Sequence, residues 1–196
     1  TIYGTQYHSF PDTKIPIVCD MSSDIFLHRF DATQFVLIYA GVQKNMGPAG
    51  ATMVILKKEL LQKIKRTLPS MLNYAIHVEG ESMFNTPPCI AIFAALQTLK
   101  WYKQRGGVAA MQKDNNEKAA ILYDELDRNS LFMPVVPAKE DRSVMNICFV
   151  MSAGKEDLQD EFLAFATEKG IVGIKGHRSV GGFRASTYNA LPKESV

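Results

Sequence analysis

The sequence lacks three features that would place a protein in a class at once. Its 22 basic residues are nearly balanced by 20 acidic ones, which argues against nucleic acid or an anionic membrane as the main partner. It has few cysteines, Cys19, Cys89 and Cys148, and they lie far apart in apolar runs, as reduced core thiols do and as disulfide or metal frameworks do not. No apolar run is as long as a membrane span, and no signal peptide opens the sequence. We therefore expect a soluble cytoplasmic protein without a bound metal or a membrane segment.

The chain of 196 residues is 46% apolar, which is enough to bury one large core or two modest ones. No repeat or low-complexity stretch interrupts it. The glycines that follow Arg105 break a helical pattern and predict a boundary, with one domain over residues 1–106 and a second over 107–196. Strands are expected at Ile15–Asp20, Phe35–Tyr39, Thr52–Leu56, Phe132–Val136, Met145–Val150, Ile171–Ile174 and Gly182–Thr187, and helices at Lys58–Thr67, Cys89–Gln104, Val108–Leu126 and Lys155–Lys169, with an irregular stretch at Leu68–Pro88.

Lys44 stands out because it lies between two apolar runs, Phe35–Tyr39 and Ala51–Leu56, in a turn rich in glycine and proline. Two buried strands joined by such a loop would present the lysine at the strand ends of an α/β sheet, where ligands usually bind. A lysine shielded from water is more readily neutral, and a neutral amine can form a Schiff base with an aldehyde. The alternative is an ordinary lysine in a surface loop.

Asp20 supplies an acid at the end of an earlier apolar strand, Ile15–Asp20. Enzymes that use pyridoxal phosphate need both groups, because a lysine holds the aldehyde and an acid keeps the pyridine nitrogen protonated. The alternative is a strand-end carboxylate satisfied by Ser22 or Ser23, and both interpretations can hold together.

With these residues in place, the sequence resembles the phosphoserine aminotransferase family from Thr1 nearly to Val196. The family's chains are about twice as long, and this one starts without a methionine, so it resembles their second half. The matching segments are Asp20–Ser23, Ala40–Asn45, Gly47–Gly50, Ser82–Pro88, Lys175–Arg178 and Gly181–Ser186.

The resemblance implies an α/β fold. Residues 1–106 would be the C-terminal part of the large pyridoxal phosphate domain of a fold type I aminotransferase. Residues 107–196 would form the small α+β C-terminal domain that follows it.

The resemblance also assigns the cofactor site. Lys44 would hold pyridoxal 5'-phosphate through a Schiff base and then act as the base that moves the proton. Asp20 would pair with the pyridinium, Gln43 would contact the cofactor phosphate, and Thr1 would lie near the ring oxygen.

Asn85 and Thr86 precede a helix that begins after two prolines. A helix start with free backbone amides suits a phosphate, although a plain N-cap explains the two residues equally well. The resemblance implies that they reach the cofactor phosphate of a neighbouring subunit, so that a homodimer shares its active sites.

His177 and Arg178 lie in a glycine-bounded turn, and Arg184 follows six residues after Arg178. Clustered arginine and histidine suit a dianionic phosphate, because arginine offers paired planar donors. The bland alternative is a basic turn with one structural ion pair. The resemblance implies that His177 and Arg178 bind the substrate phosphate and that Arg184 binds the α-carboxylate.

The implied reaction moves the amino group of glutamate to 3-phosphohydroxypyruvate and gives phosphoserine and 2-oxoglutarate, in serine biosynthesis. Some family members also act on a phosphorylated threonine analogue in vitamin B6 (pyridoxine) synthesis. Two alternatives remain open, namely another fold type I pyridoxal phosphate enzyme and an inactive fragment or dimerisation core. A desulfurase would need a reactive loop cysteine, and the three cysteines lie in apolar runs instead.

Overall fold

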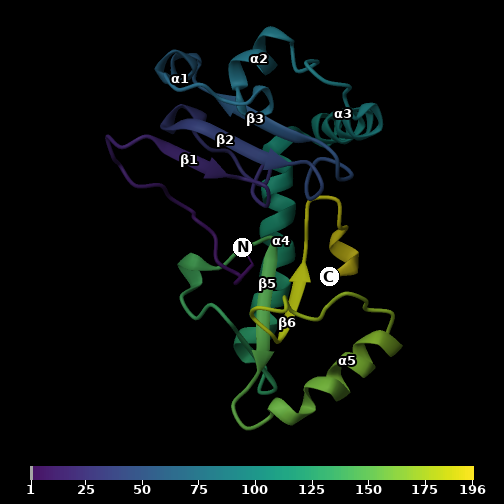
Figure 1. Ribbon diagram of the computed structural model, residues 1–196. Helices are drawn as coiled ribbons and strands as arrows, with labels where there is room; N and C mark the ends of the chain where they lie inside the picture. The colour runs from purple at the N-terminus through teal and green to yellow at the C-terminus, as the bar shows by residue number, and fades with distance from the viewer. Residues whose placement is uncertain (1) are drawn as a thin grey trace. The chain divides into compact units, whose positions relative to one another are not determined.

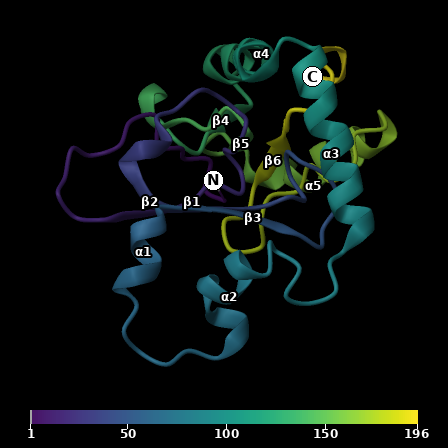
Figure 2. The same ribbon diagram turned by 90° about the horizontal axis from the view of Figure 1, so that it is seen from above.

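The computed structural model describes residues 2–196 and divides the chain into two compact units. One unit comprises Thr13–Gly107, and the other combines the residues up to Asp12 with Val108–Val196. Figures 1 and 2 show the helices and strands of both units.

The Thr13–Gly107 unit contains a sheet in the order β1–β2–β3. β1 (Ile17–Asp20) runs parallel to β2 (Phe35–Gly41), and β3 (Thr52–Leu56) runs antiparallel to β2. Because parallel strands end at the same edge of a sheet, the residues that follow β1 and β2 meet there. The helices of this unit are α1 (Lys58–Lys63), α2 (Tyr74–Glu79) and α3 (Cys89–Gln104).

The loop between β2 and β3 packs closely on α3, because it carries glycine at the point of contact. A Cβ atom added to Gly47 would lie 3.2 Å from the backbone nitrogen of Ala95, and one added to Gly50 would lie 3.4 Å from the Cβ of Ala91. These small residues let the loop follow the helix, and they fix the loop that carries Lys44 between the sheet and α3.

The second unit contains the long helix α4 (Gly107–Arg128) and a sheet in the order β4–β5–β6. Its pairs are all antiparallel, and its core joins Leu126 of α4, Ile147 and Phe149 of β5, and Phe183 of β6. Phe162 of α5 lies with its ring centroid 4.8 Å from that of Phe183, so α5 contributes to the same core. The remaining elements are β4 (Phe132–Pro134), β5 (Asn146–Met151), α5 (Gln159–Glu168) and β6 (Phe183–Ser186), and short 3-10 helices lie at Ala32–Gln34, Ser70–Leu72, Lys139–Asp141, Glu156–Leu158 and Lys193–Ser195.

The residues up to Asp12 belong to the same compact unit as Val108–Val196. The backbone nitrogen of Ser143 donates to the carbonyl of Gly4 over 2.8 Å, and the nitrogen of Gln6 donates to that of Asp141 over 3.0 Å. These partners lie more than 130 residues apart in the sequence, so no local sequence pattern could predict the pairing.

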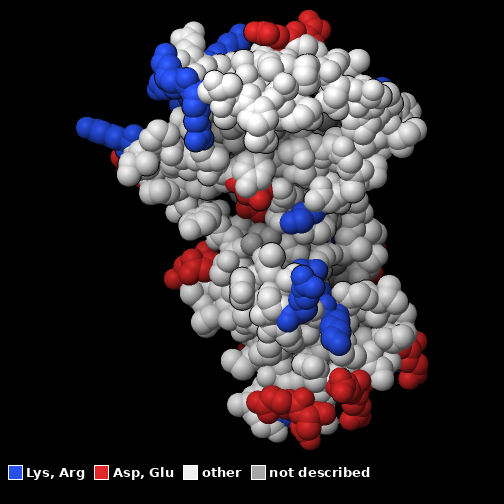
Figure 3. Space-filling view, viewed as in Figure 1, with Lys and Arg blue, Asp and Glu red and all other residues white. Residues whose placement is uncertain are grey.

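Lys118 of α4 ties down the segment that follows β6. Its side chain is only 1% exposed, and its amine donates to the carbonyls of Thr187, Tyr188 and Leu191 over 3.0, 3.0 and 3.1 Å. A buried amine is costly unless it is fully hydrogen-bonded, and these three bonds anchor the end of β6 to α4. The acidic side chains of α5, in contrast, lie on the surface (Figure 3).

Two expected elements were wrong. Ile171–Ile174 was expected to be a strand, but it is not one, because Gly170 and Gly173 adopt φ of +79° and +75° and interrupt any extended run. The stretch Leu68–Pro88 was expected to be irregular, but it contains α2, which the side chain of Asn73 caps by accepting from the nitrogen of Ala75.

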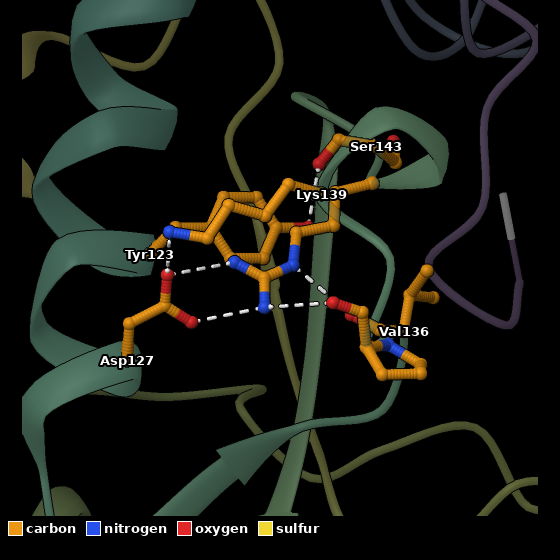
Figure 4. Close-up of polar contacts among 7 residues, drawn as sticks. Tyr123, Asp127, Val136, Lys139 and Ser143 are labelled. Carbon is orange, nitrogen blue, oxygen red and sulfur yellow. Dashed lines mark hydrogen bonds and ion pairs between the residues drawn. The ribbon is translucent and has the colours of Figure 1, made fainter.

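Arg142, which is buried, anchors the segment before β5 through an ion pair with the more exposed Asp127 (Figure 4). Its guanidinium donates two hydrogen bonds to Asp127, over 3.1 and 2.9 Å, and its Nε donates to the carbonyl of Val136 over 3.0 Å. The Lys139 amine also lies 2.8 Å from the Asp127 carboxylate. Hydrogen bonds from Arg142 and then Lys139 lower the pKa of Asp127 from 3.8 to about 2.

The lowered pKa of Asp127 predicts how the free energy of unfolding depends on pH. Because the folded pKa of Asp127 is depressed, its contribution is complete above the ordinary value of 3.8 and is lost as the pH falls towards about 2. The free energy of unfolding, measured with urea between pH 2 and 5, should therefore fall less steeply with acid in Asp127→Asn than in the wild type. The exposed Asp12→Asn is the matched control. Identical slopes in all three proteins would contradict this role of the ion pair.

Candidate functional site

The site predicted from the sequence begins at the edge of the sheet where β1 and β2 end. Asp20 is the last residue of β1 and pairs with Tyr39 of β2. Directly after it, the backbone nitrogen of Met21 donates to the carbonyl of Tyr39 over 2.8 Å. The parallel register therefore brings Asp20 next to the end of β2, and Lys44 lies in the turn that follows β2.

Hydrogen bonds hold Asp20 as a carboxylate. Partial burial alone would raise its pKa, but the Ser22 side chain, the Ser22 backbone nitrogen and the Tyr39 hydroxyl bond to it, and the charge of Lys44 adds to their effect, so that the pKa is lowered from 3.8. The Ser22 nitrogen donates over 2.9 Å. The hydroxyl of Ser22 accepts from the nitrogen of Gly41 over 3.0 Å, which links this carboxylate to β2.

Lys44 lies in the turn that follows β2. The nitrogens of Met46 and Gly47 donate to the carbonyl of Val42 over 2.9 and 2.8 Å, which closes the turn around the lysine. The side chain is half-buried, and its amine donates to the hydroxyl of Ser23 over 2.6 Å. The amine is thus held over the loop that follows β1, on the side of the sheet where Asp20 lies.

Asn45 fastens these two loops together. Its side chain is buried, and its amide nitrogen donates to the carbonyls of Ser23 and Ile25 over 3.2 and 3.0 Å. The hydroxyl of Tyr102 in α3 donates to the backbone carbonyl of Asn45. The lysine turn is therefore bonded to the loop after β1 and to α3.

The other residues proposed for the cofactor lie in the same unit. Gln43 is exposed, with its side chain against Gly41. Asn85 and Thr86 are exposed and do not cap α3, since the N-cap residue is Pro88 and no side chain bonds there. The N-cap explanation of these two residues is therefore wrong. Thr1 lies outside the described residues.

His177, Arg178 and Arg184 belong to one hairpin of the second unit. Lys175 pairs with Phe183, and the nitrogen of Arg184 donates to the carbonyl of Ile174 over 2.8 Å. The hydroxyl of Ser179 lies 2.7 Å from Nδ1 of His177.

A glycine directly before β6 makes this hairpin possible. Gly182 adopts φ of +58°, and a Cβ there would lie 2.7 Å from the carbonyl oxygen of Phe149. Such a position excludes every other residue. Arg178 is exposed in the turn, whereas Arg184 is half-buried.

The guanidinium of Arg184 carries a buried donor without a partner. Within the described part of the chain, its Nε has no hydrogen-bond partner. A buried donor left unsatisfied costs about 1–3 kcal/mol, and an anionic ligand would satisfy it.

The structure thus joins Asp20, Lys44 and Gln43 at one sheet edge and places the three anion-binding candidates in the other unit. Sequence analysis missed Tyr39, which bonds to Asp20, and Asn45, which fastens the loops. The register of two parallel strands would have revealed Tyr39, because it lies directly opposite Asp20. Nothing local in the sequence points to Asn45.

Metal-binding clusters and membrane-spanning helices are both absent from the described residues. Residues 2–196 contain no group of three or more histidine, cysteine or acidic side chains placed to hold a metal ion. None of the helices described here is long and apolar enough to cross a membrane.

Comparison with known proteins gives one family. The profile of the family described as "Aminotransferase class-V" matches residues 7–196. The chain is 60% identical over its whole length to a phosphoserine aminotransferase of Parabacteroides distasonis and 59% identical to one of Phocaeicola vulgatus. It spans 55% of each of these relatives, about half of their length.

Solved structures agree with this result. The phosphoserine aminotransferase of Bacillus circulans subsp. alkalophilus superposes with a TM-score of 0.94 at 45% identity, over 100% of this chain and 54% of that one. The enzyme of Trichomonas vaginalis, solved with pyridoxal phosphate bound, gives a TM-score of 0.93 at 39% identity, over 100% and 55%. The mixed α/β fold of the chain is therefore that of these aminotransferases over the shared part.

The bonds around Asp20 make a prediction that needs no cofactor. In Tyr39→Phe the carboxylate loses the hydroxyl that donates to it, so the pKa of Asp20 should rise towards its ordinary value. Carbon NMR titration of the aspartate carboxyl groups measures the shift. Tyr7→Phe removes an exposed hydroxyl elsewhere and should leave that titration unchanged. A Tyr39→Phe protein that titrates like the wild type would rule out the bond.

Proposed function

The chain belongs to the class-V aminotransferase family, and we propose that it is the lysine-bearing part of a phosphoserine aminotransferase. The observation that carries the proposal is the pairing of a carboxylate held ionised, Asp20, with an amine held beside it, Lys44. The chain spans about half of the relatives' length, so the activity belongs to the whole protein. We place residues 1–106 in its large domain and 107–196 in a small C-terminal domain.

The proposed reaction transfers the amino group of glutamate to 3-phosphohydroxypyruvate, with phosphoserine and 2-oxoglutarate as products, in serine biosynthesis. The names of the relatives support this choice. The related phosphorylated threonine substrate of vitamin B6 synthesis is a further candidate. A cytoplasmic location stays a prediction from the sequence.

The proposed cofactor is pyridoxal 5'-phosphate, and the residues present fit it. When bound, this group supplies an aldehyde for an amine and a protonated ring that accepts electrons. Lys44 has the amine, and Asp20 has the lowered pKa that a partner of a protonated ring nitrogen needs. Gln43, exposed beside Lys44, would contact the cofactor phosphate.

In this reaction Lys44 has two tasks. It would hold the cofactor when that group is bound, and its amine, once free, would take a proton from the substrate carbon and deliver it again. Asp20 stays ionised through these steps, because the bonds from Ser22 and Tyr39 favour the charged form.

The substrate anions are assigned to the hairpin of the second unit. Arg184, with its unpartnered buried Nε, would bind the α-carboxylate that both amino acids share. His177 and Arg178, at the exposed turn, would bind the phosphate. Arginine suits both groups because its donors match two oxygens at once.

We also propose a homodimer in which Asn85 and Thr86 reach the cofactor phosphate of the partner. Both residues are exposed and neither caps α3. The adjoining helix exposes apolar side chains, with Ile90 at 80%, Phe93 at 62% and Leu96 at 47%. Exposed apolar groups of this size mark surfaces that other protein covers, and the area around α3 is largely uncharged in Figure 3.

A second candidate is an inactive fragment that serves as a scaffold or dimerisation core. The intact mass of the purified sample separates the two candidates. A mass near the 21.8 kDa of this chain supports the fragment, and a mass about twice as large supports the enzyme.

Lys44→Ala tests the proposed function directly in the full-length protein. The wild type mixed with pyridoxal phosphate should show a visible absorption band that glutamate bleaches, and the variant should show none and lose turnover by about 100-fold or more. Lys14→Ala, at an exposed lysine of the same unit, is the control. Near-normal transamination by Lys44→Ala would refute the assignment.

The two arginines should differ in their effects on the substrates. Arg184→Ala should raise the KM for glutamate and for the phosphorylated substrate alike, by roughly 10- to 100-fold, because each loses a charge-assisted bond. Arg178→Ala should raise the KM for the phosphorylated substrate more. Steady-state kinetics with both substrates measures the difference, and equal losses in Arg178→Ala would count against its phosphate role.

A further inference from the structure

The lysine amine has a specific neighbour that the proposed reaction does not yet use. Ser23 is only 7% exposed, and its hydroxyl accepts from the Lys44 amine over 2.6 Å. We infer that Ser23 is a positioning residue, which holds the Lys44 amine in place whenever that amine is not bonded to the cofactor. This inference rests on the proposed function, because it concerns the same lysine.

The hydroxyl of Ser23 is attached to a fixed piece of backbone. The nitrogens of Asp24 and Ile25 both donate to the carbonyl of Met21, over 2.9 and 2.8 Å. The amide of Asn45 also holds the carbonyl of Ser23 itself over 3.2 Å. A partner that moves little can define where the amine lies, whereas a partner on a loose loop could not.

Lys44 needs such a partner, because a free lysine side chain is flexible. Its four-carbon stem has many rotamers, and an amine that samples many rotamers is seldom at the right distance from a reacting atom. A serine hydroxyl accepts from an ammonium and can also donate to a neutral amine. The same contact therefore persists as Lys44 gains and loses the proton.

The two adjacent serines have separate partners. Ser22 bonds to Asp20 and accepts from Gly41, whereas Ser23 bonds to Lys44. Removing the Ser23 hydroxyl therefore leaves the bonds between Ser22 and Asp20 in place.

The test uses the full-length enzyme and two variants, Ser23→Ala and Ser23→Thr. The first measurement is the rate at which cofactor-free protein gains the visible band after pyridoxal phosphate is added. We expect Ser23→Ala to be about tenfold slower, the effect of one lost bond to a charged group. In transamination, kcat should fall by a similar factor while the KM for glutamate stays within about twofold. Ser23→Thr keeps the hydroxyl and should restore both rates.

Ser143→Ala is the matched control. It removes another buried serine hydroxyl, which accepts from two backbone nitrogens of the second unit, and it should capture the cofactor at the wild-type rate. If Ser23→Ala does not fold, Ser23→Cys carries the test, because a thiol is nearly the same size and a weak acceptor. It should also be slow.

Each outcome decides the matter. Folded Ser23→Ala that captures the cofactor at the wild-type rate would overturn the inference and leave the proposed function intact. A Ser23→Thr protein as slow as the alanine variant would overturn it too, since the hydroxyl alone would then not explain the effect. Wild-type enzyme that never gains the band would instead refute the proposed function.

Discussion

The amide of Asn45 is the link on which the lysine site depends. Its two bonds, to the carbonyls of Ser23 and Ile25, join the turn after β2 to the loop after β1. Both carbonyls lie in a buried part of that loop and need a donor, and one side chain with two N–H donors satisfies both. Since Tyr102 of α3 bonds to the backbone of the same residue, the position of Lys44 is set by the sheet, the neighbouring loop and the helix together.

The parallel pairing of β1 and β2 explains why an acid and an amine meet at all. Parallel strands deliver their carboxyl ends to one edge, so Asp20 and the turn after Gly41 arrive together. The charge of Lys44 adds to the hydrogen bonds from Ser22 and Tyr39 that lower the pKa of Asp20. The antiparallel β3 contributes differently, because its return path lays the glycine-rich loop against α3. The loop that carries Lys44 is therefore held by α3 as well as by the sheet.

The elements predicted correctly are those whose ends are marked by local sequence pattern. The helix Cys89–Gln104 has the expected bounds, because proline before it and glycine after it mark both ends. The strand expected at Ile171–Ile174 was wrong, because Gly170 before it and Gly173 within it both adopt positive φ. Of the site, Lys44 and Asp20 could be named from their flanking strands. The bonds of Tyr39, Ser23 and Asn45 could not, because they depend on the register between segments about 20 residues apart.

The Thr13–Gly107 unit leaves an apolar surface of α3 exposed. A helix that buries its apolar stripe shows polar residues outside, yet α3 exposes Ile90, Ile92 and Phe93. A surface of that kind is stable only when it is covered. The same unit holds Asp20 and Lys44 firmly, whereas the anion-binding candidates lie in the other unit. In the proposed homodimer, a second copy would cover the apolar side chains of α3, and Asn85 and Thr86, which precede that helix, would reach the cofactor phosphate of that copy.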